Sequence, residues 1–370
     1  MLSFCRRFTA IFVAALLLAP LSSFAASPRQ SAPPEVVHRS DARSPSATSS
    51  IVEAKLRVQW RRLFNENAWA KLDSLANHLR TRRLRFQGGG WQLHVLYTIL
   101  STTSSETNEA WEARIAALQE WIRQSPSSPT PRIALADVYL NFAWKARGNG
   151  LPDSVTSEGW NMFEARIRKA RELLEQSERI GRVDPEWYDA MLVVASAQGW
   201  KRPQVDALAN EAITREPGYF YDVRVVADYL LPKWYGAPGD TEQFVNDVAD
   251  HIGGERGDAT YFFIAEYILT VEQCDCPSSN ARSMSWLRIR KGYAAVQRLY
   301  GTNNFEHNAL AFLALRAADD KTAARAFEQI GNNWDRDVWG SKAFFDDCRR
   351  NTLKHFRAVR PESKPIITAY

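Results

Sequence analysis

Residues 156–180, TSEGWNMFEARIRKARELLEQSERI, decide the fold class. Their apolar side chains recur at spacings of three and four positions, while charged residues occupy the positions between them. That period places one apolar stripe along an amphipathic helix, which must bury the stripe against a neighbouring element. The members of the stripe are Trp160, Phe163, Ile167, Ala170 and Leu174.

The same period runs through the rest of the chain from residue 51 onward. A second apolar stripe lies within residues 135–146, and Asp137, Asn141 and Lys145 lie on the opposite face of the same predicted helix. No run of β-branched residues alternates with polar ones between turn signals, so no strand is expected. The sequence therefore predicts an all-α fold. The two further stripes are Leu135, Val138, Tyr139, Phe142 and Ala146, and then Val223, Val226, Ala227 and Leu230.

Helix starts are marked at short intervals. Thr130-Pro131 and Asp184-Pro185 each place a capping side chain before a proline at the first helical position, where the missing N–H costs nothing. Residues 240–243, DTEQ, have the spacing of a capping box. Starts at intervals of this kind are typical of antiparallel helix pairs joined by short loops.

Residues 227–240, ADYLLPKWYGAPGD, predict a junction between two helices. Pro232 ends the first helix near Leu231, because proline disfavours the α conformation in the residue before it. Asp240 begins the next helix. Trp234 and Tyr235 lie between these points, and two interpretations stay open: the rings fill the gap between helix ends, or they form an exposed platform that binds a partner.

Two segments resemble tetratricopeptide units of a first helix, a turn and a second helix. Residues 304–330 carry small residues and Phe327 at suitable positions, and residues 187–217 match less closely, because Val193 and Ala209 depart from the pattern. The units differ in length. We therefore expect an irregular tetratricopeptide-like α-solenoid of antiparallel helix pairs, spanning residues 51–360.

The chain also resembles an uncharacterised bacterial family of exported proteins with a tetratricopeptide-like domain of unknown function, family 4034. The resemblance implies a helical-repeat fold and implies no activity. The segments that carry it are GGGWQLHVLYTIL (88–100), FAWKARGNG (142–150), GWNMF (159–163), EPGYF (216–220) and LLPKWYG (230–236).

The N-terminus has the composition of a signal peptide, residues 1–25. Arg6 and Arg7 precede an apolar run, and Ser23-Phe24-Ala25 supplies small residues for cleavage. Residues 26–50 are rich in Ser, Pro and Ala and predict a flexible linker; residues 361–370 form a C-terminal tail. We expect an exported protein, periplasmic or secreted, with no membrane span after cleavage.

The charge balance and the cysteines restrict the partners. Cleavage removes Arg6 and Arg7 and lowers the formal net charge from +5 to +3, which argues against nucleic acid. Cys274 and Cys276 are too close in sequence for an easy mutual bridge, so one of them, with Cys276 as the candidate, could pair with Cys348. Three unpaired thiols are the alternative.

Four arginines, Arg80, Arg82, Arg83 and Arg85, precede residues 88–90, GGG. They suit a solvated helix C-terminus. Alternatively, they bind an acidic partner or an anionic glycan, and on that interpretation Arg82, Arg83 and Arg85 join Trp234 and Tyr235 as candidate partner-binding residues.

Catalytic signatures are missing from the sequence, including phosphate loops, nucleophile elbows and zinc-protease helices. Residues 335–346 approach a calcium loop, but Trp339 stands where an oxygen ligand belongs. His94 lies in an apolar segment and fits a core histidine. No catalytic residue, cofactor or metal ligand is predicted.

The sequence therefore favours an interaction or scaffold module with an unknown protein partner, possessing no evident catalytic activity. The alternative is a helical, toroid-like carbohydrate-binding protein or enzyme using carboxylates such as Glu164, Asp184 and Glu186. A third interpretation is a structural spacer in the cell envelope. An open stack would separate the first from the second, because a toroid closes around a deep acidic pocket.

Overall fold

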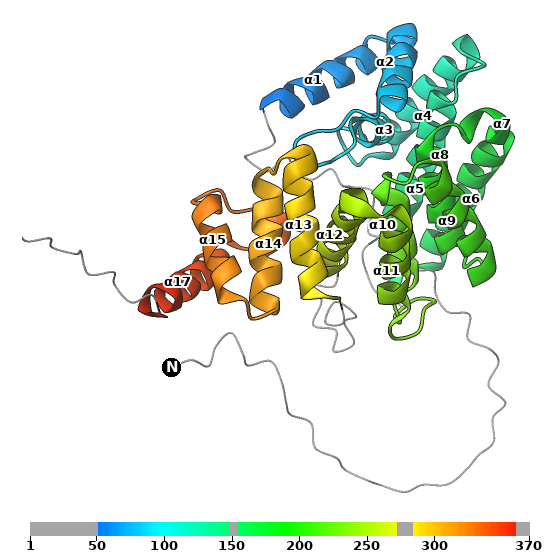
Figure 1. Cartoon of the computed structure of the whole chain (residues 1–370). Coiled ribbons are helices and arrows are strands. Elements are labelled where there is room, and N and C mark those ends of the chain that lie inside the picture. The colour runs from blue at the N-terminus through cyan, green and yellow to red at the C-terminus, as the bar shows by residue number, and fades with distance from the viewer. Residues whose placement is uncertain (1–50, 149–153, 272–283, 360–370) are drawn as a thin grey trace, which may run out of the picture.

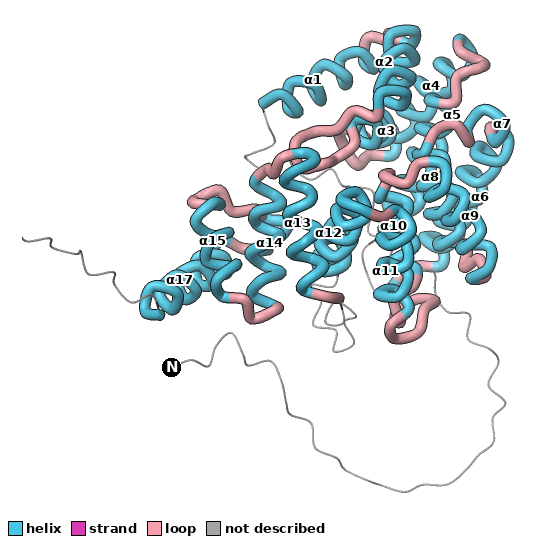
Figure 2. Tube along the Cα trace, in the orientation of Figure 1, coloured by secondary structure: helices cyan, strands magenta, loops and turns pink. Residues whose placement is uncertain are grey.

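The computed structural model describes residues 51–148, 154–271 and 284–359 (Figure 1). These ranges contain helices and no strand (Figure 2); Arg85 and Trp91 form one isolated antiparallel bridge. The predicted all-α fold is confirmed. The predicted signal peptide, linker and C-terminal tail lie outside the described residues. Within the described ranges, no helix has both the length and the apolar character that a membrane span needs.

The described ranges are built from helices that follow one another along the chain. In chain order they are α1 (Ile51–Asn65), α2 (Trp69–Arg82), α3 (Gln92–Ser101), α4 (Asn108–Gln124), α5 (Thr130–Arg147), α6 (Ser157–Gln176), α7 (Glu178–Gly181), α8 (Pro185–Ala197), α9 (Arg202–Arg215), α10 (Phe220–Tyr229), α11 (Asp240–Ile252), α12 (Gly254–Val271), α13 (Trp286–Tyr300), α14 (Asn304–Arg316), α15 (Asp320–Ile330), α16 (Arg336–Trp339) and α17 (Lys342–Val359).

Consecutive helices pack as pairs: α5 with α6, α8 with α9, α10 with α11, α12 with α13, and α14 with α15. The first members of these five pairs also contact one another in chain order, from α5 through α8, α10 and α12 to α14, and α3 contacts α5. We call α3 and these five first members the inner helices. Contact between successive pairs is what a helical-repeat stack requires.

The inner helices differ from their partners in burial. All 13 residues of α8 are buried, and α10 is buried everywhere except at Val225. The second helices are amphipathic: α6 buries Phe163, Ile167 and Leu174 on one stripe and exposes its charges, while Trp160 is half-buried. The inner helices therefore form the axis of the molecule, and the second helices cover them.

The predicted repeat units lie on real helix pairs. Residues 304–330 are α14 and α15, and residues 187–217 cover α8 and α9. In the first unit Ala311, Ala314 and Phe327 are buried, as the pattern requires. The solenoid geometry of the whole stack stays a prediction.

Several local predictions were wrong, for physical reasons. Asp137 and Asn141 face protein, not solvent, because α5 is an inner helix. Thr130 lies inside α5, whose N-cap is Pro129. Asp240 does not cap α11, which begins after Gly239; its carboxylate accepts from the Ala237 N–H at 3.0 Å and closes the preceding turn instead.

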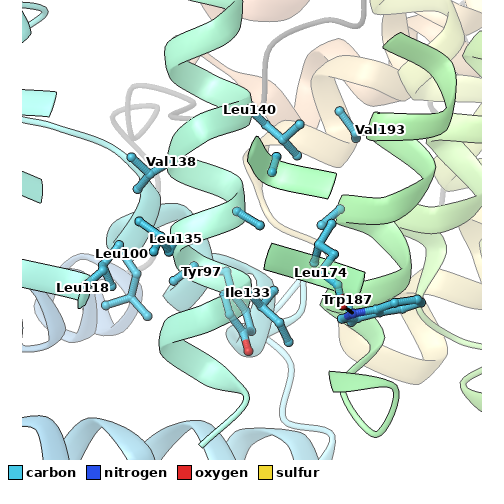
Figure 3. Packing of buried hydrophobic residues seen from close by; sticks show 14 of the residues in the cluster. Tyr97, Leu100, Leu118, Ile133, Leu135, Val138, Leu140, Leu174, Trp187 and Val193 are labelled. Carbon is cyan, nitrogen blue, oxygen red and sulfur yellow. Dashed lines mark hydrogen bonds between the residues drawn. The ribbon is translucent and has the colours of Figure 1, made fainter. Parts of the chain in front are cut away.

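The hydrophobic core is divided mainly between the two halves of the chain. The N-terminal cluster packs α3, α4, α5, α6 and α8 together (Figure 3). Trp187 of α8 fits tightly there, since its indole N–H donates to the Leu174 carbonyl at 3.0 Å. A second cluster joins α10 to α17, and it includes Trp91 from the other half of the chain.

Trp91 belongs to the α2–α3 loop, residues 83–91, which crosses to the C-terminal half (Figure 2). Gly88 N–H donates to the Gly301 carbonyl at 3.2 Å, and the Gln87 side chain donates to the Thr302 carbonyl at 2.8 Å. In a simple stack each repeat contacts only its neighbours. This loop instead joins α2 and α3 to the α13–α14 turn. The loop therefore closes the arrangement by connecting the N-terminal helices directly to the C-terminal ones.

Candidate functional site

The inner helices bring a group of polar side chains together in the centre of the molecule. His94 comes from the first turn of α3, and Glu186 and Asp189 come from one face of α8. Tyr219 and Tyr221 come from the start of α10. All five are buried, and we call them the polar centre. Its position results from the packing of α3 and α8 on α5 and of α10 on α8.

Glu186 is the hub of the polar centre. Its Oε2 lies 3.0 Å from Nδ1 of His94 and accepts a hydrogen bond from the Tyr219 hydroxyl. The ring of Tyr221 stacks on the imidazole, with 3.6 Å between the ring centroids. Burial, and then the nearby Glu186 charge, raise the pKa of Tyr219 well above its usual value, so this phenol stays a donor.

Asp189 completes a set of three metal-ligating groups. The imidazole nitrogen and one oxygen from each carboxylate all lie within 4.8 Å of one another. Glu186 and Asp189 are three positions apart, which puts both on the same side of α8. Chemically, the arrangement offers one nitrogen and two oxygen donors at a single point.

A second buried group adjoins the polar centre through α8. Asp184 caps α8 by accepting from the Glu186 N–H at 3.0 Å, which confirms the predicted cap. It also accepts from Arg80 Nε at 2.8 Å and from the Tyr97 hydroxyl at 2.6 Å. Burial opposes the charge on Arg80, but Asp184 outweighs it and raises the pKa of Arg80. The ion pair thus fastens α2 to α8.

The predicted arginine surface is mostly engaged within the molecule. Arg83 Nε donates to Glu216 at 2.6 Å, and the Arg83 side chain stays exposed. Arg85 is half-buried: it donates to the carbonyls of Gly89 and Gly218, each at 2.8 Å, and its guanidinium lies over Trp91. Burial lowers the pKa of Arg85. Arg82 is exposed at the end of α2.

The predicted aromatic candidates lie at the α10–α11 junction, where α10 ends at Tyr229. Tyr235 stacks on Tyr229 at 4.7 Å, and its hydroxyl lies 3.4 Å from the Ser196 carbonyl. Trp234 is half-buried against the C-terminal core cluster. Gly236 is required by contact, since a Cβ there would lie 1.9 Å from the Leu230 carbonyl oxygen. Both rings therefore cover the helix ends.

The remaining candidates fall in different places. Cys348 is buried on α17, whereas Cys276 lies outside the described residues, so their proposed bridge is still a prediction. Glu164 is exposed on α6, whereas Asp184 and Glu186 are buried, so the three carboxylates do not share one environment. Asp335 caps α16 by accepting from the Asp337 N–H at 3.0 Å.

Sequence reasoning noted His94 and Glu186 separately and missed their association. The two residues are 92 positions apart, and no local pattern links them. Asp189 and the two tyrosines were also missed. The signal available was the spacing of Asp184, Glu186 and Asp189, three acids on an otherwise apolar helix, which is unusual because buried carboxylates need partners.

Searches against models of known protein families, curated proteins and solved structures each found no match. The resemblance to the exported tetratricopeptide-like family therefore stays a prediction.

Proposed function

We propose that this chain is an exported helical-repeat interaction module that binds an acidic segment of a protein partner at the edge formed by α1 and α4. The stacked pairs support a binding role, because helical-repeat proteins present extended surfaces on rigid elements. The inner helices are covered, so the recognition surface belongs to the outer helices and edges. The N-terminal signal-like residues support export.

The observation that carries the proposal is Arg114 on α4. Its guanidinium lies 4.1 Å from the centroid of the Phe64 ring, and its Nη1 is buried with no hydrogen-bond partner in the described structure. Burial, followed by the charge of Arg61, lowers the pKa of Arg114 to about 10. Within the described ranges, neither arginine has a carboxylate at ion-pair distance.

An arginine held in this way costs stability, because a half-buried charge without a counter-charge loses part of its hydration and the Phe64 ring compensates only part of that loss. A carboxylate would supply the missing acceptors through charge-assisted hydrogen bonds. Val58, one turn before Arg61 on α1, is exposed and offers apolar contact beside the two charges. The edge therefore matches an acidic segment that also carries an apolar side chain.

The test is fluorescence anisotropy with a labelled peptide of alternating glutamate and leucine residues and the full chain. We expect saturable binding that weakens as salt rises, since exposed charges are screened. Arg61→Gln and Arg114→Met should each weaken binding about tenfold, the value of one lost charge-assisted hydrogen bond. Arg123→Gln is the matched control: Arg123 is exposed on α4 and is paired with Glu120, so its loss should change little.

A stability measurement separates binding from folding. Arg114→Met keeps the contact with Phe64 and removes the uncompensated charge, so its melting temperature should equal or exceed that of the wild type. The proposal fails if the wild type does not bind the peptide, if both variants bind as the wild type does, or if Arg114→Met melts at a clearly lower temperature.

A further inference from the structure

We propose that His94, Glu186 and Asp189 bind one divalent transition-metal ion, with Zn²⁺ the best match, as a structural site that joins α3 to α8. The inference goes beyond the proposed binding function and depends on different residues. The sequence predicts no metal ligand, because the three side chains meet only in the folded chain.

The distances fit ligands that share an ion. Zn²⁺ binds imidazole nitrogen and carboxylate oxygen at about 2.0–2.2 Å, which places neighbouring ligand atoms about 3–3.5 Å apart. His94 Nδ1 and Glu186 Oε2 are 3.0 Å apart, and the third ligand atom lies within 4.8 Å of both. A rotation of the Asp189 carboxylate would bring that oxygen into the shell.

The donor set suits a divalent ion. One imidazole nitrogen and two carboxylate oxygens are buried within 4.8 Å of one another. A transition-metal dication accepts nitrogen and oxygen ligands of this kind, and its charge would offset the charges of the two carboxylates.

The surroundings are those expected around a metal ligand set. The Tyr219 hydroxyl donates to Glu186 Oε2, and the Tyr221 ring holds the imidazole from one side. Tyr221 is held in turn by the Trp91 N–H, 3.3 Å from its hydroxyl oxygen. Groups of this kind fix the orientation of ligating side chains and raise metal affinity. The α2–α3 loop thus reaches the site through Trp91.

Burial makes the site structural instead of catalytic. His94, Glu186 and Asp189 are only 6%, 1% and 2% exposed, so a substrate cannot reach an ion held between them. An ion bound at this point would be incorporated during folding and would link two inner helices. Its effect should therefore appear in stability and not in turnover.

The experiment uses the full chain with Cys274→Ser and Cys276→Ser, which removes two thiols as competing ligands. The protein is stripped with EDTA and titrated with Zn²⁺, while heat release and melting temperature are recorded. We expect one ion per chain and a melting temperature raised by about 5 °C at a hundredfold excess over Kd. Binding should release protons and strengthen as pH rises, because the ligands must be deprotonated.

Two near-isosteric variants assign the ligands. Asp189→Asn keeps the His94–Glu186 pair and His94→Gln removes the imidazole; each should weaken Zn²⁺ binding at least tenfold and abolish the thermal shift. Asp335→Asn is the matched control, because Asp335 is an equally buried acid outside the site and asparagine also caps helices. It should bind Zn²⁺ like its parent.

The proposal is overturned if the stripped chain binds no Zn²⁺ up to millimolar concentration. It is also overturned if Asp189→Asn and His94→Gln, folded by circular dichroism, bind as tightly as the control. If either variant fails to fold, the wild-type stoichiometry and thermal shift still decide the outcome.

Discussion

Trp234 and Tyr235 show how single residues close the end of a helix. The rings lie where α10 stops and the chain turns toward α11, and they cover backbone groups that have no helical partner. Nζ of the exposed Lys233 lies 5.4 Å from the centroid of the Trp234 ring. Of the two interpretations left open by the sequence, the packing supports the structural one.

Trp234→Ala should therefore destabilise the fold. The indole is half-buried, so we expect a loss of about 2 kcal/mol, below the range for a fully buried tryptophan. Chemical denaturation measures the change, and Lys233→Ala is the control, since an exposed neighbour should cost less than about 0.5 kcal/mol. An unchanged unfolding curve for Trp234→Ala would return the ring to the list of exposed partner-binding groups.

Capping residues mark the limit of sequence reasoning at this scale. The Asp184-Pro185 signal was correct because the cap needs only local geometry. Asp240 fits the same local pattern, yet Gly239 adopts a left-handed conformation with φ of 94° and is the N-cap. The helix therefore begins at Asp240, one residue earlier than it would with Asp240 as the cap. Such choices depend on how the preceding turn packs, which a sequence window does not contain.

At the scale of elements, helical periodicity located the helices but not their burial. An amphipathic pattern predicts one buried apolar face and one exposed polar face. The prediction is correct for α6, because that helix lies on the outside of the helix pairs. It fails for α5, α8 and α10, whose polar residues are buried as well. Helices surrounded by protein on all sides must pair their charges internally, and this is how Asp184, Glu186 and Asp189 came to lie in the core.

The α2–α3 loop is the element whose role was least visible in the sequence. Gly89 has φ of 87°, and a Cβ there would lie 2.5 Å from Cζ of Phe263 on α12. A Cβ at Gly88 would likewise lie 2.6 Å from the Asn303 and Glu306 side chains, so close contact with the C-terminal half requires glycine at both positions. No periodic signal reports a contact of this kind, because its partners are about 200 positions away.

Gly89→Ala should loosen this contact. The substitution adds both a strained φ and a clash, so the melting temperature should fall and proteolysis should begin within residues 83–91. Gly331→Ala is a matched control with φ of 57° and open space around its Cβ, so it carries the strain alone. Equal effects of the two variants would show that the loop is not tightly held.

At the scale of the whole molecule, burial shifts the titration of several tyrosines. Burial raises the pKa of Tyr235 to about 12 and, likewise, that of Tyr293 to about 12. An unfolded tyrosine titrates near pH 10. Because the folded pKa lies above the unfolded one, the neutral phenols contribute stability below about pH 10, and this contribution is lost as the pH rises toward 12.

The melting temperature should therefore fall between pH 10 and pH 12. A Tyr235→Phe/Tyr293→Phe variant cannot lose protons at these positions, so its decline should be shallower than that of the wild type. A series of thermal melts at constant ionic strength measures both slopes. Parallel declines would mean that these two phenols titrate normally in the folded protein.

The α2–α3 loop docks on the α13–α14 turn and joins the two halves of the chain in a closed arrangement. Hydrogen exchange of the intact chain, followed by mass spectrometry, tests this directly. Phe86, Gly88 and Gly89 each donate a backbone hydrogen bond, so the peptide covering residues 84–91 should exchange slowly, close to the rate of α8. Exchange of that peptide within seconds, as in an exposed loop, would contradict the closed arrangement.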